Sequence, residues 1–374
     1  GLFTGPISQA HEWPREIFSF ALALQNLLWG VATPVAGALA DRYGAARVLM
    51  VGAVLYAAGT VLMAVADAPL MFSIGGGILV GIGVAMSSFG IVMAALGRMV
   101  PPEKRSWAFG IATASGSMGQ FIFAPLGGAM ISAFGWYNAL LVLAASTLLI
   151  IVFALPLMVQ NTSASKAEAG EADITMGAAI TRAFGHRSYV LLVSGFFVCG
   201  FQLAFITVHL PPYLAEHRIS AEIAGLALGA IGLFNVAGSY ASGIIGGKYQ
   251  KRLPLSLIYF LRSLAIAAFI LLPVTTASTF LFTATMGFLW LSTVPLTMGL
   301  VTVMFGTRYM ATLYGFVFLS HQVGSFFGVW LGGRLYDQFG SYDIVWWMSI
   351  ALGLFAALVH LPIREQRSPQ FAAA

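Results

Sequence analysis

Apolar segments of about 20 residues recur along almost the whole chain, separated by short polar stretches, and this pattern restricts the fold more than any other feature. Each segment is long enough to cross the hydrocarbon core of a bilayer as an α-helix, which satisfies its backbone polar groups internally. Only 8% of the residues are charged and 59% are hydrophobic, too little charge to cover a water-soluble domain of this size. The sequence therefore predicts an all-α integral membrane protein.

The expected helices follow from the positions of the apolar segments and of the polar residues that separate them. Their approximate ranges are 16–40, 46–66, 69–96, 106–133, 136–159, 188–210, 221–246, 254–272, 279–305, 311–335 and 342–362.

An internal repeat organises these helices. Segment 126–139, LGGAMISAFGWYNA, aligns with segment 331–344, LGGRLYDQFGSYDI, so that the glycine pair, the Phe-Gly and the tyrosine coincide. The same offset of 205 or 206 residues relates further positions, including Pro6 and Pro212, His11 and His217, Gly37 and Gly243, Gly110 and Gly315, and Ser115 and Ser320. A correspondence over several helices predicts two homologous six-helix halves related by a pseudo-twofold axis.

We expect an N-terminal half over residues 1–159, a cytoplasmic linker over 160–187 and a C-terminal half over 188–374. The repeat offset places the start of the first helix before residue 1, so most of that helix is expected to be missing from this chain. Within the linker, Asn161–Asp173 is polar, and Ile174–His186 is compatible with a short helix on the membrane surface.

The distribution of Lys and Arg predicts the orientation of the bundle. With the loop after the helix at 16–40 in the cytoplasm, only Arg15, Arg218 and Arg334 among the loop cations fall outside. We therefore expect a monomeric, multi-pass protein of the cell inner membrane, with the linker and the C-terminus cytoplasmic. The net charge of +5 does not indicate nucleic-acid binding, because the basic residues lie in loops between apolar helices.

Two motifs resemble a known family. GALADRYGAAR at 37–47 resembles the signature loop of the major facilitator superfamily, and GIIGGKYQKR at 243–252 is its degenerate copy in the second half. HEWPREIFSFALALQNLLWG at 11–30 resembles the monocarboxylate and oxalate/formate porter branch, which includes bacterial members of unknown substrate. The resemblance implies the major facilitator fold and transport by alternating access, without an enzymatic step or a cofactor.

The resemblance also implies a gating role for the signature loop. In this interpretation the glycines permit close backbone approach and the charged residues close the inner face; the alternative is that the charges only fix topology. The gating candidates are Gly37, Asp41, Arg42, Gly44 and Arg47.

The arginine that such porters usually carry in their eighth helix is absent from residues 233–240. Arg262, eight residues into the helix at 254–272, is the candidate that would replace it as the counter-charge of an anion. The alternatives are that Arg262 extends toward the interface or pairs with backbone carbonyls.

Polar groups near the middle of a membrane helix are candidates for substrate binding, because burying them is costly. The alternative is that they form hydrogen bonds between helices. The candidates are Gln120, Gln202, Asn235, Ser292, Thr293, His321, Gln322 and Arg262. Ser87 and Ser88 occupy the repeat positions of Ser292 and Thr293. His321 is also the candidate proton carrier, because imidazole gains and loses a proton near neutral pH.

These observations predict a secondary active transporter of a small organic anion, most simply a monocarboxylate, with proton coupling left open. Its partners would be that substrate, the lipid bilayer and protons. The alternatives are an exporter of lipophilic compounds and a membrane sensor that binds a ligand without transport. We find no cluster with metal-ligand spacing, no nucleophile–base pair and no phosphate-binding loop in the sequence, so no enzymatic activity, metal or cofactor is expected.

Overall fold

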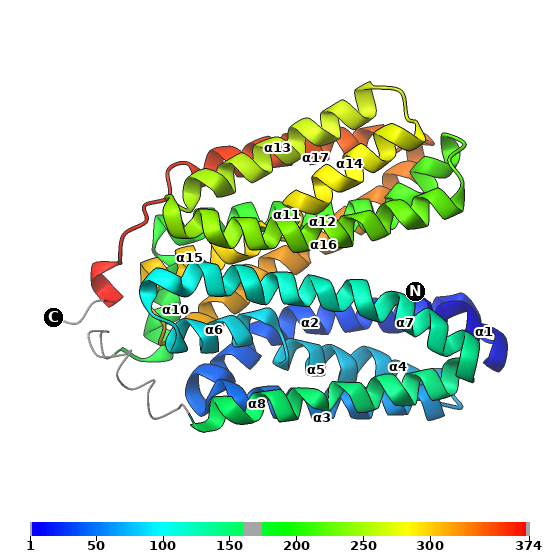
Figure 1. The fold of residues 1–374 in the computed structure, drawn as a ribbon, viewed down its shortest axis with the longest axis horizontal. Coiled ribbons are helices and arrows are strands. Elements are labelled where there is room, and N and C mark those ends of the chain that lie inside the picture. The colour runs from blue at the N-terminus through cyan, green and yellow to red at the C-terminus, as the bar shows by residue number, and fades with distance from the viewer. Residues whose placement is uncertain (1, 160–173, 372–374) are drawn as a thin grey trace. The chain divides into compact units, whose positions relative to one another are not determined.

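The computed structural model describes residues 2–159 and 174–371, and within these ranges the chain forms helices and no strands (Figure 1). Nine of the helices in the described part are long and apolar enough to cross a membrane. This confirms the prediction of an all-α membrane protein. The polar segment Asn161–Asp173 falls in the gap and lies outside the described residues.

The first half of the sequence forms α1 to α8 and a π-helical turn within them. Their bounds are α1 Thr4–His11, α2 Arg15–Tyr43, α3 Ala45–Val65, α4 Pro69–Ser73, the π-helix Ile74–Leu79, α5 Val80–Met86, α6 Phe89–Met99, α7 Arg105–Thr147 and α8 Leu149–Val159.

The remainder forms α10 to α17. Their bounds are α10 Met176–Phe184, α11 Arg187–Glu216, α12 Ala221–Lys248, α13 Arg252–Leu271, α14 Thr276–Leu289, α15 Thr293–Phe305, α16 Met310–Phe339 and α17 Asp343–His360. The short α10 falls in the part of the linker where a short helix was expected.

Four expected helices differ in continuity from the structure. α7 covers the helix expected at 106–133 and the first part of the one expected at 136–159, which α8 completes. Gly135, with φ 77°, makes the turn between the two because glycine adopts this conformation without a steric penalty. The helix expected at 69–96 is divided into α4, the π-helix, α5 and α6. The helix expected at 279–305 is divided into α14 and α15.

The described residues form two compact units whose boundary does not follow the repeat. The first contains 2–95, 122–159 and 309–315, and the second contains 96–121, 174–308 and 316–371. Each unit thus includes one short segment from the opposite half of the sequence. In the first unit α3 packs against α5 and α8; in the second α13 packs along α17 and α12 along α14 (Figure 1).

Glycines allow close packing where segments 96–121 and 309–315 contact helices from the opposite half of the sequence. In the second unit, a Cβ added to Gly243 would lie 2.6 Å from the Cα of Gly110. In the first unit, a Cβ added to Gly315 would lie 2.7 Å from the Cα of Pro34, and Gly37 faces the backbone of Ala311 equally closely. Gly37 and Gly243 are repeat partners, as are Gly110 and Gly315, so the same small-residue crossing is formed twice.

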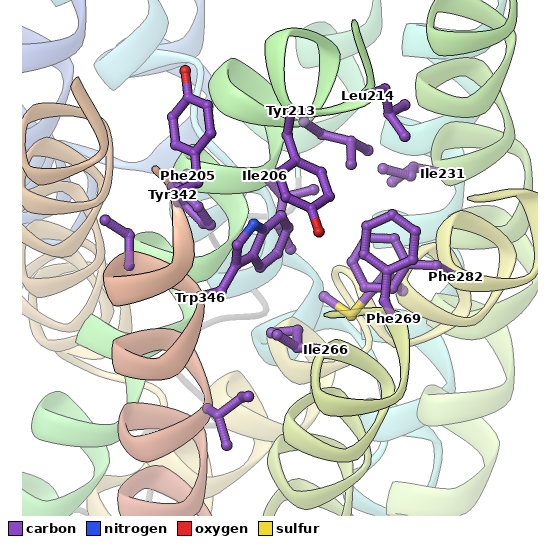
Figure 2. Packing of buried hydrophobic residues seen from close by; sticks show 14 of the residues in the cluster. Phe205, Ile206, Tyr213, Leu214, Ile231, Ile266, Phe269, Phe282, Tyr342 and Trp346 are labelled. Carbon is purple, nitrogen blue, oxygen red and sulfur yellow. The ribbon is translucent and has the colours of Figure 1, made fainter. Parts of the chain in front are cut away.

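An aromatic cluster stabilises the end of the second unit where α11 ends and α17 begins (Figure 2). The ring of Trp346 on α17 lies 4.7 Å from that of Phe205 and 5.3 Å from that of Tyr213, both on α11. The rings of Phe269 and Phe282 stack at 4.2 Å on the other side of Trp346. This packing fixes α11, α13, α14 and α17 relative to one another within the unit.

Candidate functional site

The candidate site surrounds Trp290–Ser292, the three residues between α14 and α15, which we call the helix break. Pro295 accounts for its position, because proline has no N–H to donate to the carbonyl of Leu291 and its ring collides with that carbonyl in a continuous helix. A break leaves backbone N–H and C=O groups without intrahelical partners, and these groups need other partners in an apolar environment. Side chains from α12 and α13 provide them.

Arg262 of α13 binds the carbonyl groups at the end of α14. Its Nε and Nη2 donate to the Leu289 carbonyl at 3.2 and 2.7 Å, and Nη2 also donates to the Trp290 carbonyl. The guanidinium lies over the ring of Tyr259, 5.3 Å from its centroid. Arg262 is fully buried, so its side chain does not extend to the membrane interface. It pairs with the carbonyl groups of Leu289 and Trp290 instead.

Arg262 forms no ion pair with a carboxylate in the described part of the chain. Its polar partners are the carbonyl groups of Leu289 and Trp290 and the sulfur of Cys199.

Asn235 of α12 binds the break from the other side. Its Oδ1 accepts hydrogen bonds from the Leu291 N–H at 2.9 Å and from the Ser239 hydroxyl at 3.2 Å, and its Nδ2 donates to Ser117 Oγ at 2.8 Å. Ser242, two turns along the same helix, donates to the Ser292 carbonyl. Asn235 is 1% exposed, and its amide holds α12, α7 and the helix break together.

Cys199 of α11 connects Arg262 to His321 of α16. Its sulfur accepts a hydrogen bond from Arg262 Nη1 at 3.5 Å, lies 3.5 Å from Thr293 Oγ1 and also interacts with the imidazole of His321. Cys199 is fully buried. Cys199 is not among the residues expected at the site, because a single cysteine in an apolar segment has no polar signature.

His321 is partly exposed and lies against two aromatic rings. The Phe318 ring stacks on it at 5.4 Å, and the Phe196 ring lies 5.2 Å away. Its Nδ1 is 3.2 Å from Oε1 of Gln322. His321 and Gln322 lie in the same unit as Asn235, Ser292, Thr293 and Arg262.

Two candidates are not placed at the break. Gln202 of α11 is fully buried and donates from Nε2 to the Ser349 carbonyl at 3.0 Å, which places its amide against α17. Its environment is that of a hydrogen bond between helices. The side chain of Gln120 lies outside the described residues.

The first unit contains a related interruption at Ser87 and Ser88, between α5 and α6. These serines are the repeat partners of Ser292 and Thr293, so the two halves are interrupted at equivalent positions. The hydroxyl groups of Ser87 and Ser88 are buried and have no hydrogen-bond partner among the described residues, whereas the helix break of the second unit is bound by Arg262.

In the signature loop, Asp41 binds the start of α16. Its Oδ2 accepts hydrogen bonds from the Thr312 N–H at 2.8 Å and from the Thr312 hydroxyl at 2.7 Å, and Oδ1 is 3.4 Å from the Ala311 N–H. A carboxylate at a helix N-terminus is favoured by the helix dipole. Arg42 and Arg47 are exposed, and Gly44 has φ 92° where the chain turns into α3.

Membrane-length helices that are interrupted within the apolar region, with polar side chains converging on the interruption, are typical of secondary transporters. Among the described residues there is no group of three or more His, Cys, Asp or Glu that would hold a metal ion. The chain belongs to the Major Facilitator Superfamily, whose sequence profile matches residues 2–329. This assignment confirms the expected fold and makes the protein a transporter and not an enzyme.

Individual relatives are distant but span most of the chain. The uncharacterized MFS-type transporter YcxA of Bacillus subtilis is 24% identical, covering 98% of this chain and 90% of the relative. Monocarboxylate transporter 11 of Mus musculus is 27% identical, and the match covers 87% of this chain and 73% of the relative. The oxalate:formate antiporter of Oxalobacter formigenes is 22% identical, and the match covers 91% of this chain and 80% of the relative. A solved structure of the E. coli fucose:proton symporter FucP shares the fold at a TM-score of 0.71 and 16% identity, covering 96% of this chain and 94% of FucP.

Proposed function

We propose that the protein is a secondary active transporter that carries a small organic anion, a monocarboxylate in the simplest case, by alternating access and with proton coupling. It would span a cell inner membrane with the linker and the C-terminus in the cytoplasm. The names of two relatives, a monocarboxylate transporter and an oxalate:formate antiporter, support an organic acid as the substrate class.

The observation that carries this proposal is the positive charge of Arg262 at the helix break. A buried cation without a carboxylate partner among the described residues stabilises an anion that approaches it, because charge interactions are strong where water is excluded. In this proposal Arg262 takes the part of the arginine that is absent from residues 233–240. A lipophilic compound without charge would gain nothing from it.

The contact of Asp41 with Thr312 supports alternating access. It joins α2 to α16, which come from opposite halves of the sequence, through two hydrogen bonds to one carboxylate oxygen. In the proposed cycle this contact opens when the substrate site is exposed to the cytoplasm and forms again when the site faces outward.

The substrate class is tested by uptake of radiolabelled organic acids into proteoliposomes that contain the purified protein. We expect saturable uptake of small carboxylates that an imposed inward proton gradient stimulates. Accumulation of hydrophobic dyes without uptake of acids would instead support an exporter of lipophilic compounds. Ligand binding without flux would support a sensor, and either result would contradict the proposal.

His321 is proposed to carry the coupled proton, because it is partly exposed and interacts with Cys199, which Arg262 also contacts. A change in its protonation would alter the electrostatic potential beside the substrate charge. We expect His321→Ala to retain exchange of labelled for unlabelled substrate but to lose stimulation by a pH gradient. The control is His217→Ala, which removes a histidine at the end of α11. This variant should keep its stimulation by a pH gradient. Unchanged proton stimulation in His321→Ala would exclude this role.

A further inference from the structure

An open cavity, which we call the outer cavity, lies in the second unit away from the helix break. Its volume is ≈ 720 Å³, and its polar and aromatic lining comprises His209, Trp330, Arg334, Asp337 and Gln338. This volume is within the range of about 300–1,000 Å³ that is typical of small-molecule sites. Arg334 follows His321 by thirteen residues on α16, a separation of about 20 Å along the helix. A small molecule bound in the outer cavity therefore does not contact the helix break.

Arg334 provides the positive charge of the outer cavity. Its guanidinium lies over the ring of Trp330, 5.8 Å from the centroid, and it makes no ion pair with an acidic side chain in the described ranges. Stacking on an indole restricts the guanidinium plane while the N–H donors at its edge stay available. A planar fork of donors in this state matches the two oxygens of a carboxylate.

His209 forms a wall that the surrounding packing holds in place. Its Nε2 is 3.0 Å from the Val329 carbonyl, and its ring lies 5.3 Å from that of Tyr342 and 5.5 Å from that of Phe205. Both rings belong to the aromatic cluster of Figure 2, where Phe205 packs edge-on against Trp346. The cavity wall is therefore part of the packed core of the unit, which favours a preformed site.

Asp337 determines which anions fit the outer cavity. It lines the cavity together with Arg334, one helical turn away. An acid with an apolar body would place hydrocarbon against the Asp337 carboxylate and displace its water. The carboxylate would then lose its hydrogen bonds to water and gain none from the ligand. An acid that carries hydroxyl groups avoids this cost, since the hydroxyls donate to Asp337. The amide of Gln338 both donates and accepts, and it suits further hydroxyls.

We propose that the outer cavity is a binding site for a hydroxylated carboxylic acid, with the carboxylate on Arg334 and the hydroxyl groups on Asp337 and Gln338. This inference rests on the proposed function, in which organic anions are the substrates, and narrows their class. By the orientation predicted above, this end of α16 faces outward, so the site binds the anion before it reaches the helix break.

The test is equilibrium binding of radiolabelled gluconate to the purified full chain in detergent. Two competitors each lack one recognition element: hexanoate has the same number of carbons and the carboxylate without hydroxyls, and glucose has hydroxyls without the carboxylate. We expect gluconate to bind at least tenfold more tightly than either competitor. Arg334→Gln should weaken gluconate binding about tenfold or more, whereas Arg218→Gln, which removes another outward-facing arginine outside the cavity, should change it less than twofold.

Asp337→Asn is the second variant, since it tests the hydroxyl recognition independently. It should lower the preference for gluconate over hexanoate, because the carboxylate that penalises an apolar body is neutralised. The proposal is overturned if the wild type does not bind gluconate, if hexanoate or glucose competes as well as gluconate, or if well-folded Arg334→Gln binds as the wild type does. If Arg334→Gln does not fold, unchanged selectivity in Asp337→Asn overturns it.

Uptake measured with the same preparations separates this site from the transport proposal. Arg334-dependent binding without any flux would refute transport and leave the outer cavity as a binding site. Flux of organic anions together with gluconate binding that Arg334→Gln and Asp337→Asn leave unchanged would leave transport intact and refute the outer cavity.

Discussion

Replacing Arg262 with glutamine is expected to lower the thermal stability of the protein and to raise the KM for an organic anion about tenfold. The first effect follows from the carbonyl groups of Leu289 and Trp290, which lose the charged donor that Arg262 provides. The loss should be about 3 kcal/mol in the free energy of unfolding. The second effect follows from the loss of the buried positive charge.

Lysine at position 262 separates the two effects. Arg262→Lys keeps the charge, but a single ammonium group cannot reproduce the planar set of donors that spans two carbonyls and the Cys199 thiol. We therefore expect Arg262→Lys to lose stability as the glutamine variant does while its KM stays within about threefold of the wild type. Thermal unfolding in detergent and initial rates of uptake measure the two quantities.

The control for this pair is Arg252→Gln, which removes the same charge from the first residue of the same helix. Arg252 is partly exposed at the start of α13, where its side chain donates to the Leu361 carbonyl and to Gln250 Oε1. It should change neither quantity appreciably. If Arg262→Gln is as stable as the wild type, Arg262 does not stabilise the helix break. If its KM equals that of the wild type, Arg262 does not attract the substrate anion.

The second large effect is expected for Gly243→Ala. The new methyl group would lie 2.6 Å from the Cα of Gly110 and 2.8 Å from the Ser106 carbonyl, both of them backbone atoms that cannot rotate away. α7 and α12 must then separate, at a cost of about 2 kcal/mol. Asn235 bonds to Ser117 across the same pair of helices, so the separation also strains the binding of the helix break. We expect reduced thermal stability and a loss of transport of about tenfold or more.

Gly229→Ala is the matched control, because Gly229 lies on the same helix and a Cβ there would meet nothing within 4 Å. Both substitutions raise helix propensity by up to about 1 kcal/mol, so this contribution cancels in the comparison. Gly229→Ala should leave transport unchanged and stability equal or slightly higher. Equal behaviour of the two variants would contradict the close crossing of α7 and α12.

The depth of polar residues in the apolar segments predicted candidates for the site. Ser292 and Thr293 were expected at the middle of a membrane helix together with Asn235, and in the structure all three lie at the helix break; their role in binding stays a prediction. The prediction was possible because helix length and rise fix the depth of a residue once the ends of the apolar segment are known. The same reasoning cannot give the direction of a side chain, which is why Gln202 was grouped with them although it faces α17.

What the sequence determined by itself is the helical membrane architecture and the duplicated motifs. These properties depend on local composition and periodicity, and each apolar segment carries them independently of its neighbours. Only the tertiary structure decided that one interrupted helix gathers Arg262, Asn235 and Cys199 while its repeat partner at Ser87 and Ser88 does not. The physical reason is that the carbonyl and N–H groups these side chains bind become available only where a helix stops, and their partners come from other helices far away in the sequence.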